Sequence, residues 1–370
     1  MKFTTSSAEL LKVITKAGGV VPSRSTLPIL ENYLFDLSSD NLRVTATDLE
    51  VSLSTVVHVK GEGNGKLAVP AKRLMETIRA LPNVEIKFSM DNGSKKLNMK
   101  TKTGEYTLAG ESSDDYPTIA LPKTENKLTV DRDTFTRLIN QTLFATSSDE
   151  LRPAMMGVLF QIRKNEIRAV STDGHRLVRL NTTAGSSKEE RDIIVPSKAL
   201  NILTKSLEEE NCTIAVDEAQ AVFMFGETVL VTRLIGERYP NYESVIPTDN
   251  DKKLLVNRND MLAAVRRVAL YASSTTHQVR LSLKKNGVTV SAEDADFGNE
   301  AKETLDCEYS AESMDIGFNA NYVVDVLSHL DMEEIVFEFS TPTRAGIVHP
   351  AKQRDGEDLL MLIMPVRLNA

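Results

Sequence analysis

The sequence predicts an α+β protein built from three similar domains, each with two helices packed on antiparallel sheets. Three observations predict this fold class: an internal repeat with a period of about 125 residues, a strand followed by a helix at the start of each copy, and a second helix followed by an alternating strand. A period of this length exceeds those of solenoids and propellers, so each copy is expected to hold its own core. The predicted domains span residues 1–124, 125–249 and 250–370.

Each copy begins with a short strand and a helix cap. The strands are expected at 2–5, 127–130 and 253–256. Ser6, Asp131 and Asn257 follow at one equivalent position, and Glu9 completes a Ser-x-x-Glu capping box in the first copy. These residue types are favoured helix N-caps. Apolar residues then recur at i, i+4 and i+7, which predicts amphipathic helices at 8–17, 134–145 and 259–272.

A second helix recurs later in each copy. It is expected at 71–81, 197–207 and 320–330, and alternating strands such as 84–88 and 335–339 follow it. The first two copies end alike, in proline-bounded stretches that begin at Tyr116 and Tyr239, and this pattern predicts linkers. Two helices on one face of a mostly antiparallel sheet give a layered α+β domain.

Charge is distributed unevenly along the chain. The formal net charge is -8, which argues against binding nucleic acid through overall charge. The six expected helices nevertheless sum to +6, so the rest of the chain carries -14. A single basic helix is usually a solvated outer face, but six equivalent helices with this bias favour a common surface for a phosphate backbone. The basic residues are Lys12, Lys16, Lys72, Arg73, Arg79, Arg137, Lys198, Lys205, Arg266 and Arg267.

Several classes of function lack their sequence signals. The chain contains no phosphate-binding loop of the Walker type, no Gly-x-Ser-x-Gly elbow and no His-Glu-x-x-His motif. Cys212 and Cys307 are far apart, so neither a disulfide framework nor a zinc site is expected, and no cofactor is expected. The N-terminus lacks an apolar secretion segment, and no run of eighteen apolar residues occurs, so we expect a cytoplasmic protein.

One segment, residues 171–177, contains side chains that could take part in catalysis or binding. Asp173 and His175 could form an acid–base pair, with Arg176 as an anion anchor. The alternative is a turn between two strands, in which Asp173 caps and Gly174 supplies a positive φ. Acidic residues stand at similar places in the other two copies, which favours the structural role for Asp173. His175 and Arg176 are not repeated, so they are the candidates for a binding surface.

The repeat and three motifs together resemble the bacterial sliding clamps, the beta subunits of DNA polymerase III. The motifs are residues 172–177, residues 364–368 near the C-terminus, and Arg24 ahead of 26–30. The resemblance covers the whole chain. It implies a head-to-tail homodimer that closes a six-domain ring around duplex DNA, with twelve helices facing the channel and no catalysis. It also implies partners: the replicative polymerase alpha subunit, the clamp loader, and other polymerases and repair proteins that carry a clamp-binding motif.

The resemblance implies three sets of site residues. A hydrophobic cleft for partner peptides would be formed by Met155, Thr172, Gly174, His175, Arg176, Leu177, Pro240, Val245, Asn319, Tyr322, Thr343, Met364, Pro365, Val366, Arg367 and Leu368. The residues facing DNA would be Arg24, Arg73, Arg152 and Lys198, joined on charge alone by Lys12, Lys72, Arg137, Lys205, Arg266 and Arg267. The dimer contact would set Ile78, Tyr106 and Leu108 against Leu270 and Tyr271. No catalytic or metal-binding residue is implied.

Two other classes of function are carried as alternatives. A hydrolase that uses Asp173 and His175 predicts that His175→Ala abolishes turnover of some substrate. A monomeric adaptor with a peptide cleft would have no role on DNA, because a monomer cannot encircle it.

Overall fold

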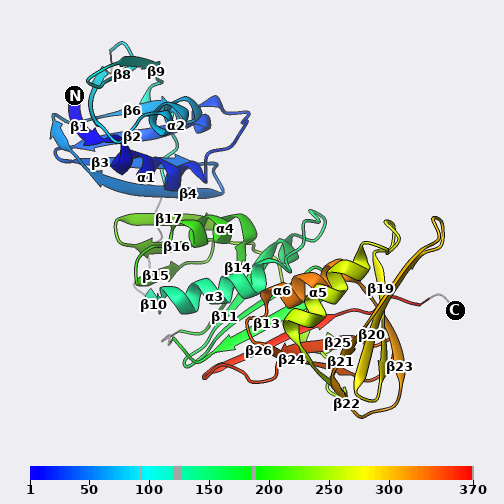
Figure 1. The fold of residues 1–370 in the computed structure, drawn as a ribbon. Helices are drawn as coiled ribbons and strands as arrows, with labels where there is room; N and C mark the ends of the chain where they lie inside the picture. The colour runs from blue at the N-terminus through cyan, green and yellow to red at the C-terminus, as the bar shows by residue number, and fades with distance from the viewer. Residues whose placement is uncertain (92, 120–126, 186–188, 369–370) are drawn as a thin grey trace. The chain divides into compact units, whose positions relative to one another are not determined.

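The computed structural model describes residues 1–91, 93–119, 127–185 and 189–368, and within these it contains six α-helices (Figure 1). They are α1 (Ser7–Gly18), α2 (Ala71–Ala80), α3 (Arg132–Leu143), α4 (Ser197–Ser206), α5 (Arg258–Ala269) and α6 (Ala320–His329). All six expected helices are therefore confirmed, with ends shifted by no more than three residues.

Helix caps and apolar stripes form as the sequence predicts. Ser6 Oγ accepts a hydrogen bond from the backbone N–H of Glu9 at 3.1 Å. Asn257 Oδ1 accepts from the backbone N–H groups of the second and third residues after it. Such contacts satisfy backbone donors that have no partner inside the helix. Leu10 and Ile14 on α1, and Val265 on α5, are fully buried, so the apolar face of each first helix lies in the core.

The described chain divides into two compact units. The first comprises Met1–Asp133 with Lys198–Leu234, and the second Thr134–Ser197 with Ile235–Ala370. Each unit contains one larger and one smaller sheet, and neighbouring strands pair antiparallel.

The first unit holds a five-stranded sheet, in the order β5-β1-β7-β8-β9, and an eight-stranded sheet, in the order β10-β15-β16-β17-β4-β3-β2-β6. The strands of the smaller sheet are β1 (Lys2–Ser6), β5 (Lys60–Glu62), β7 (Glu85–Asp91), β8 (Lys96–Lys100) and β9 (Glu105–Ala109). Those of the larger sheet are β2 (Asn32–Ser38), β3 (Asn41–Thr47), β4 (Val51–His58), β6 (Gly65–Pro70), β10 (Lys127–Asp131), β15 (Asn211–Val216), β16 (Gln220–Phe225) and β17 (Thr228–Arg233). Helix α1 packs on β3 and β4 and beside α2.

The second unit repeats this plan with a nine-stranded sheet, in the order β14-β11-β12-β13-β26-β25-β24-β18-β22, and a four-stranded sheet, in the order β21-β20-β19-β23. The strands of the larger sheet are β11 (Gly157–Ile162), β12 (Ile167–Thr172), β13 (Arg176–Thr182), β14 (Arg191–Pro196), β18 (Lys252–Asn257), β22 (Glu308–Tyr309), β24 (Glu334–Phe339), β25 (Gly346–Pro350) and β26 (Glu357–Ile363). Those of the smaller sheet are β19 (Gln278–Lys284), β20 (Gly287–Asp294), β21 (Asn299–Asp306) and β23 (Met314–Asn319). Helix α5 packs on β20 and β21 and beside α6.

The described parts of the two stretches expected to be linkers contain no α-helix or β-strand, and they are packed against the sheets. Tyr116 is 6% exposed, and its hydroxyl donates to the carbonyl oxygens of Asn32 and Thr45 at 3.2 and 3.3 Å. Tyr242 is equally buried and lies in a cluster with Leu177. The prolines correctly indicate where regular structure ends. Tyr116 and Tyr242 nevertheless hold these two segments against the sheets.

The domain boundaries stay predictions. The boundary at 124 lies outside the described residues, and the one at 249 falls just before β18. The compact units divide the predicted second domain between them. The reason is strand pairing, because β17 pairs with β4 in the first unit, and β13 pairs with β26 in the second.

Candidate functional site

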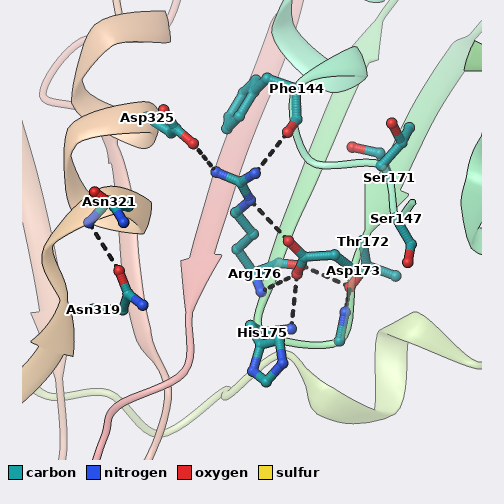
Figure 2. Close-up of polar contacts among 12 residues, drawn as sticks. Phe144, Ser147, Ser171, Thr172, Asp173, His175, Arg176, Asn319, Asn321 and Asp325 are labelled. Carbon is teal, nitrogen blue, oxygen red and sulfur yellow. Dashed lines mark hydrogen bonds and ion pairs between the residues drawn. The ribbon is translucent and has the colours of Figure 1, made fainter. Parts of the chain in front are cut away.

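The segment that joins β12 to β13 is a tight turn closed by its own side chains (Figure 2). Asp173 Oδ1 accepts hydrogen bonds from the backbone N–H groups of His175 and Arg176 at 2.9 and 3.0 Å. Thr172 Oγ1 accepts from the N–H of Gly174 at 3.1 Å and donates to the carbonyl of Arg176. Gly174 has φ +89°, a conformation that glycine adopts without strain. The interpretation of Asp173 and Gly174 as turn residues is confirmed.

Arg176 is buried and fully committed to neighbours, so the hypothesis of a free anion anchor is wrong. The residue is 9% exposed. Its guanidinium donates to Asp173 Oδ2 at 3.1 Å, to Asp325 on α6, and to the carbonyl oxygen of Phe144 at 2.8 Å (Figure 2). It also lies over the rings of Phe144 and Tyr322, 5.2 and 4.9 Å from their centroids. Arg176 therefore connects the β12–β13 turn with the end of α3 and with α6.

An acid–base pair does not form at this turn. Among the described residues, the Asp173 carboxylate contacts the His175 backbone and not its ring. The His175 imidazole instead stacks on Tyr322, with centroids 5.7 Å apart and the planes inclined by 17°. His175 is exposed on its other side. A hydrolase that uses Asp173 and His175 would require contact between the carboxylate and the imidazole ring, so the structure argues against this alternative.

The C-terminal tail runs from the turn to the smaller sheet of the same unit. The N–H of Met364 donates to the carbonyl of His175 at 2.8 Å, and the N–H of Val366 donates to the carbonyl of Gly317 on β23 at 2.9 Å. A Cβ added at Gly317 would lie 2.9 Å from the backbone carbonyl oxygen of Val366, so glycine is needed for this close approach of the two backbones. The apolar tail thus covers a surface of its own chain.

Two of the apolar side chains predicted for the cleft are exposed. Val245 and Met364 are 53% and 41% exposed. Beneath the turn, Leu177 and Leu362 face each other across β13 and β26 and are buried with Tyr242. Large exposed apolar groups next to a rigid apolar floor are suited to receive an apolar ligand.

The other residues predicted for the cleft lie in the second unit. Tyr322 contacts the turn directly, and Asn319 caps α6 by accepting from the N–H of Asn321 at 2.9 Å. Met155 and Pro365 are half-buried, and Pro240, Thr343 and Arg367 are exposed.

The predicted DNA-facing residues of the first unit fall into two groups. Lys72 and Arg73 on α2 are exposed and form no ion pair within the described part of the chain, and the same holds for Arg24 and Lys205. Lys12 and Lys198 are also exposed but are paired with carboxylates. The partner of Lys12 is Glu208 at 3.3 Å, and that of Lys198 is Asp48.

Arg137 of the second unit corrects the prediction that all these cations are free to face DNA. Its side chain is 13% exposed and is held between two carboxylates: Nη1 lies 2.7 Å from Asp331, and Nε lies 2.8 Å from Glu357. Its charge is neutralised inside the protein, so we remove Arg137 from the DNA-facing set.

Three other predicted cations of the second unit are exposed but contact neighbours. Arg152 Nε donates to Asp149 at 2.8 Å, and its Nη1 donates to the carbonyl of Asp173 in the turn. Arg267 Nε donates to Glu303 on β21 at 2.7 Å. Arg266 donates to a serine hydroxyl of α6 at 3.1 Å.

Three of the five residues predicted for the dimer contact are exposed. Leu270 and Tyr271, directly after α5, are 82% and 45% exposed, and Tyr106 on β9 is 36% exposed. Leu108 is half-buried. Ile78 lies on the buried face of α2 and is only 1% exposed. It has no surface that could contact a second chain, so its assignment to the dimer contact is wrong.

Sequence reasoning missed the residues that hold the cations in place. Phe144, Asp325 and Glu357 belong to no motif, and they lie far along the chain from the arginines they contact. The one sequence signal for Asp48 is its position in the first copy, which corresponds to that of Asp173 in the second copy.

Among the described residues, no group of three or more His, Cys, Asp or Glu side chains is placed to hold a metal ion. No helix in the described ranges is long and apolar enough to cross a membrane.

Comparison with known proteins identifies similar sequences over the full length. Family models described as DNA polymerase III beta subunit match the chain three times: the N-terminal domain at residues 1–120, the central domain at 129–241 and the C-terminal domain at 243–367. The beta sliding clamps of Pseudomonas aeruginosa and Vibrio cholerae are 30% and 29% identical to it, and each alignment covers 100% of both chains.

Solved structures give the same relationship. A sliding clamp (DNA polymerase III subunit beta) from Pseudomonas aeruginosa bound to griselimycin superposes with a TM-score of 0.93 at 30% identity. A DNA polymerase sliding clamp from Bacillus subtilis superposes with a TM-score of 0.92 at 25% identity. Both comparisons cover 100% of each chain.

Proposed function

The chain belongs to the family of DNA polymerase III beta subunits, the beta sliding clamps, and from this membership we propose that it is a non-catalytic processivity factor that encircles duplex DNA as a homodimer. The ring would slide along the duplex in the cytoplasm and hold a polymerase on it. Retention by topology needs only weak direct contacts, because a closed ring cannot leave a circular duplex by diffusion.

The observation that carries this proposal is the placement of exposed cations on the helices. Lys72, Arg73 and Lys205 are solvent-exposed on α2 and α4, in a chain whose remaining segments are strongly acidic. Basic helices support sequence-independent contact with a phosphate backbone. The acidic remainder would discourage DNA from binding elsewhere.

Two open sheet edges support a head-to-tail dimer. Strand β9 is the last strand of its sheet in the first unit, and β21 is the last strand of its sheet in the second. An edge strand presents unpaired backbone groups that a second chain can join. The exposed Tyr106 lies on β9, and α5, which packs on β21, ends beside Leu270 and Tyr271. Because the two edges are different surfaces, their pairing is heterologous and closes a ring when the rotation per chain permits.

The strands at these edges differ in net charge. Lys96 and Lys100 on β8 outnumber Glu105 on β9, which pairs with Lys100, whereas Glu300, Glu303 and Asp306 on β21 outnumber Lys302. Opposite charges across an interface favour one orientation and disfavour pairing of like edges.

The surface beside the β12–β13 turn would receive the peptide motifs of partners. His175 and Tyr322 form one wall, the buried Leu177 lies beneath, and Val245 and Met364 supply exposed apolar contacts. An extended peptide with a few apolar side chains is the ligand that suits such a surface. The proposed partners are the replicative polymerase alpha subunit, the clamp loader, and other polymerases and repair proteins with this motif.

Retention on circular DNA tests the proposal. The protein is loaded by a clamp loader and ATP onto nicked circular DNA, and its retention is measured before and after a restriction enzyme linearises the circle. Release upon cutting is expected for a ring. Persistence after cutting would mean that direct affinity holds the protein, and the proposal would be wrong. Sedimentation adds an independent check, because a monomer cannot encircle DNA.

A further inference from the structure

A basic hollow with a single carboxylate lies between α1 and α4 in the first unit. Its volume is about 690 Å³. Four lysines line it: Lys12, Lys16, Lys198 and Lys205. The one acidic residue in its lining is Glu208, which follows α4. The helices that carry these lysines are the ones proposed to face DNA.

Glu208 is paired with two of these lysines. Its Oε2 lies 2.9 Å from Lys16 Nζ and 3.3 Å from Lys12 Nζ. The Glu208 side chain is 49% exposed and that of Lys12 is 59% exposed, so both remain accessible to a ligand. The Lys16 side chain is only 14% exposed, so Lys12 is the more accessible of the two lysines. Lys16 lowers the pKa of Glu208 by hydrogen bonding, and Lys12 adds to the effect, so the carboxylate is ionised at neutral pH.

The backbone of Glu208 is fixed independently of its carboxylate. Arg132 Nη1 donates to the Glu208 carbonyl oxygen at 3.1 Å. Within the described chain, the carboxylate contacts Lys12 and Lys16. Because this backbone contact does not involve the carboxylate, we expect that substitution of Glu208 by glutamine keeps the chain path and removes the negative charge that pairs with both lysines.

We propose that Glu208 is a resident counter-anion that competes with DNA phosphates for Lys12 and Lys16 and so weakens direct contact between this surface and the duplex. The inference rests on the proposed function, since it assumes that the hollow faces DNA. A phosphate that approaches must displace the carboxylate, and the carboxylate returns when the phosphate leaves. The net gain per contact is small, which suits a protein that must slide along DNA without stopping.

Three other predicted DNA-facing cations have a carboxylate beside them in the same way. Lys198 is paired with Asp48, Arg152 with Asp149, and Arg267 with Glu303. Asp48 is unsuitable for a clean test, because its second oxygen accepts from two backbone N–H groups of the β3–β4 turn. Within the described chain, the Glu208 carboxylate accepts no such hydrogen bond from backbone N–H groups.

The test compares Glu208→Gln with Glu209→Gln. Glu209 is exposed and forms no ion pair in the described ranges, so the two variants change net charge equally at adjacent positions. Binding to a short linear fluorescent duplex is measured by anisotropy over a series of salt concentrations. Glu208→Gln is expected to bind at least about threefold tighter at low salt and to steepen the slope of log K against log salt by about 1 to 2, because each freed lysine that contacts a phosphate releases about 0.9 counterion. Glu209→Gln is expected to leave the slope unchanged.

A third variant assigns the effect to the lysines. Glu208→Gln combined with Lys12→Ala and Lys16→Ala is expected to lose the gain. Equal affinity and slope for the two glutamine variants, or a gain that survives removal of both lysines, would overturn the inference. Retention of the wild-type protein on circular DNA reports on the ring separately, so a failure there is distinguishable from a failure of the role proposed for Glu208.

Discussion

Substitution of Arg176 by alanine should destabilise the second unit, because the guanidinium holds three segments together. Arg176→Ala removes hydrogen bonds to Asp173, Asp325 and the Phe144 carbonyl, and leaves Asp173, whose side chain is 14% exposed, without its cation. Breaking a buried ion pair by removing one partner costs about 3–5 kcal/mol.

The lower end of that range applies here. Asp325 is 44% exposed and regains water when Arg176 is removed, and Asp173 keeps two backbone N–H partners. We therefore expect a loss of about 3 kcal/mol in the free energy of unfolding. For a compact unit of about 200 residues, each kcal/mol lowers the melting temperature by about 2–4 °C, so the expected fall is about 6–12 °C.

Differential scanning calorimetry measures this fall, and Arg179→Ala is the matched control. Arg179 lies on the same strand and pairs with Asp358, which is 52% exposed. An ion pair with so exposed a partner contributes at most about 1 kcal/mol. Arg176→Lys should fall between wild type and Arg176→Ala, because one ammonium cannot reproduce the three directed donors. A melting temperature for Arg176→Ala equal to that of the Arg179→Ala control would refute the reasoning.

Four further outcomes are expected. Arg73→Glu should shorten retention on DNA and reduce the slope of log K against log salt concentration by about 1, while the dimer stays intact. An unchanged slope in binding assays would show that Arg73 does not face the DNA. Leu270→Asp should convert the dimer to monomer in sedimentation, and Leu151→Asp, which alters an equally exposed leucine outside the predicted contact, should not. Met364→Ala should weaken binding of a partner peptide about tenfold in titration calorimetry without changing the ring, since it removes roughly 1.4 kcal/mol of apolar contact; unaltered affinity would exclude Met364 from the site. Lys16 lowers the pKa of Glu208, so this ion pair contributes to stability above the ordinary pKa of 4.5, and the contribution is lost as the pH falls through the lower pKa of the folded state. The difference in melting temperature between wild type and Glu208→Gln should therefore vanish in acid. A difference that persists in acid contradicts the assignment.

Local patterns determined most of the fold. The caps at Ser6 and Asn257 and the apolar stripes predicted the helices because capping and burial both act within a few residues. Ile78 belongs to the second expected helix of the first copy, and the resemblance implies a dimer contact for it, whereas the structure buries it in the core. At this position the role transferred by resemblance does not fit the packing of the chain.

Contacts between distant segments could not be predicted. Arg137 looked like a surface cation on an amphipathic helix, yet its carboxylate partners Asp331 and Glu357 come from more than 190 residues away. The same applies to Arg176, whose partner Asp325 lies on α6. No spacing rule joins such groups, because only the assembled sheets bring them within reach. The turn at Thr172 could be predicted, since every bond that closes it is made within five residues.

Two sheets continue from one predicted domain into the next, and this limits how the protein can be divided into fragments. Seven residue pairs join β13 to β26, and four join β17 to β4. A fragment cut at a domain boundary would leave one member of each pair as a bare edge, and buried apolar residues such as Leu359 and Met361 on β26 would be uncovered with it. Such edges are templates for intermolecular pairing, so we expect the isolated repeats to aggregate more readily than a chain that keeps both members of each strand pair.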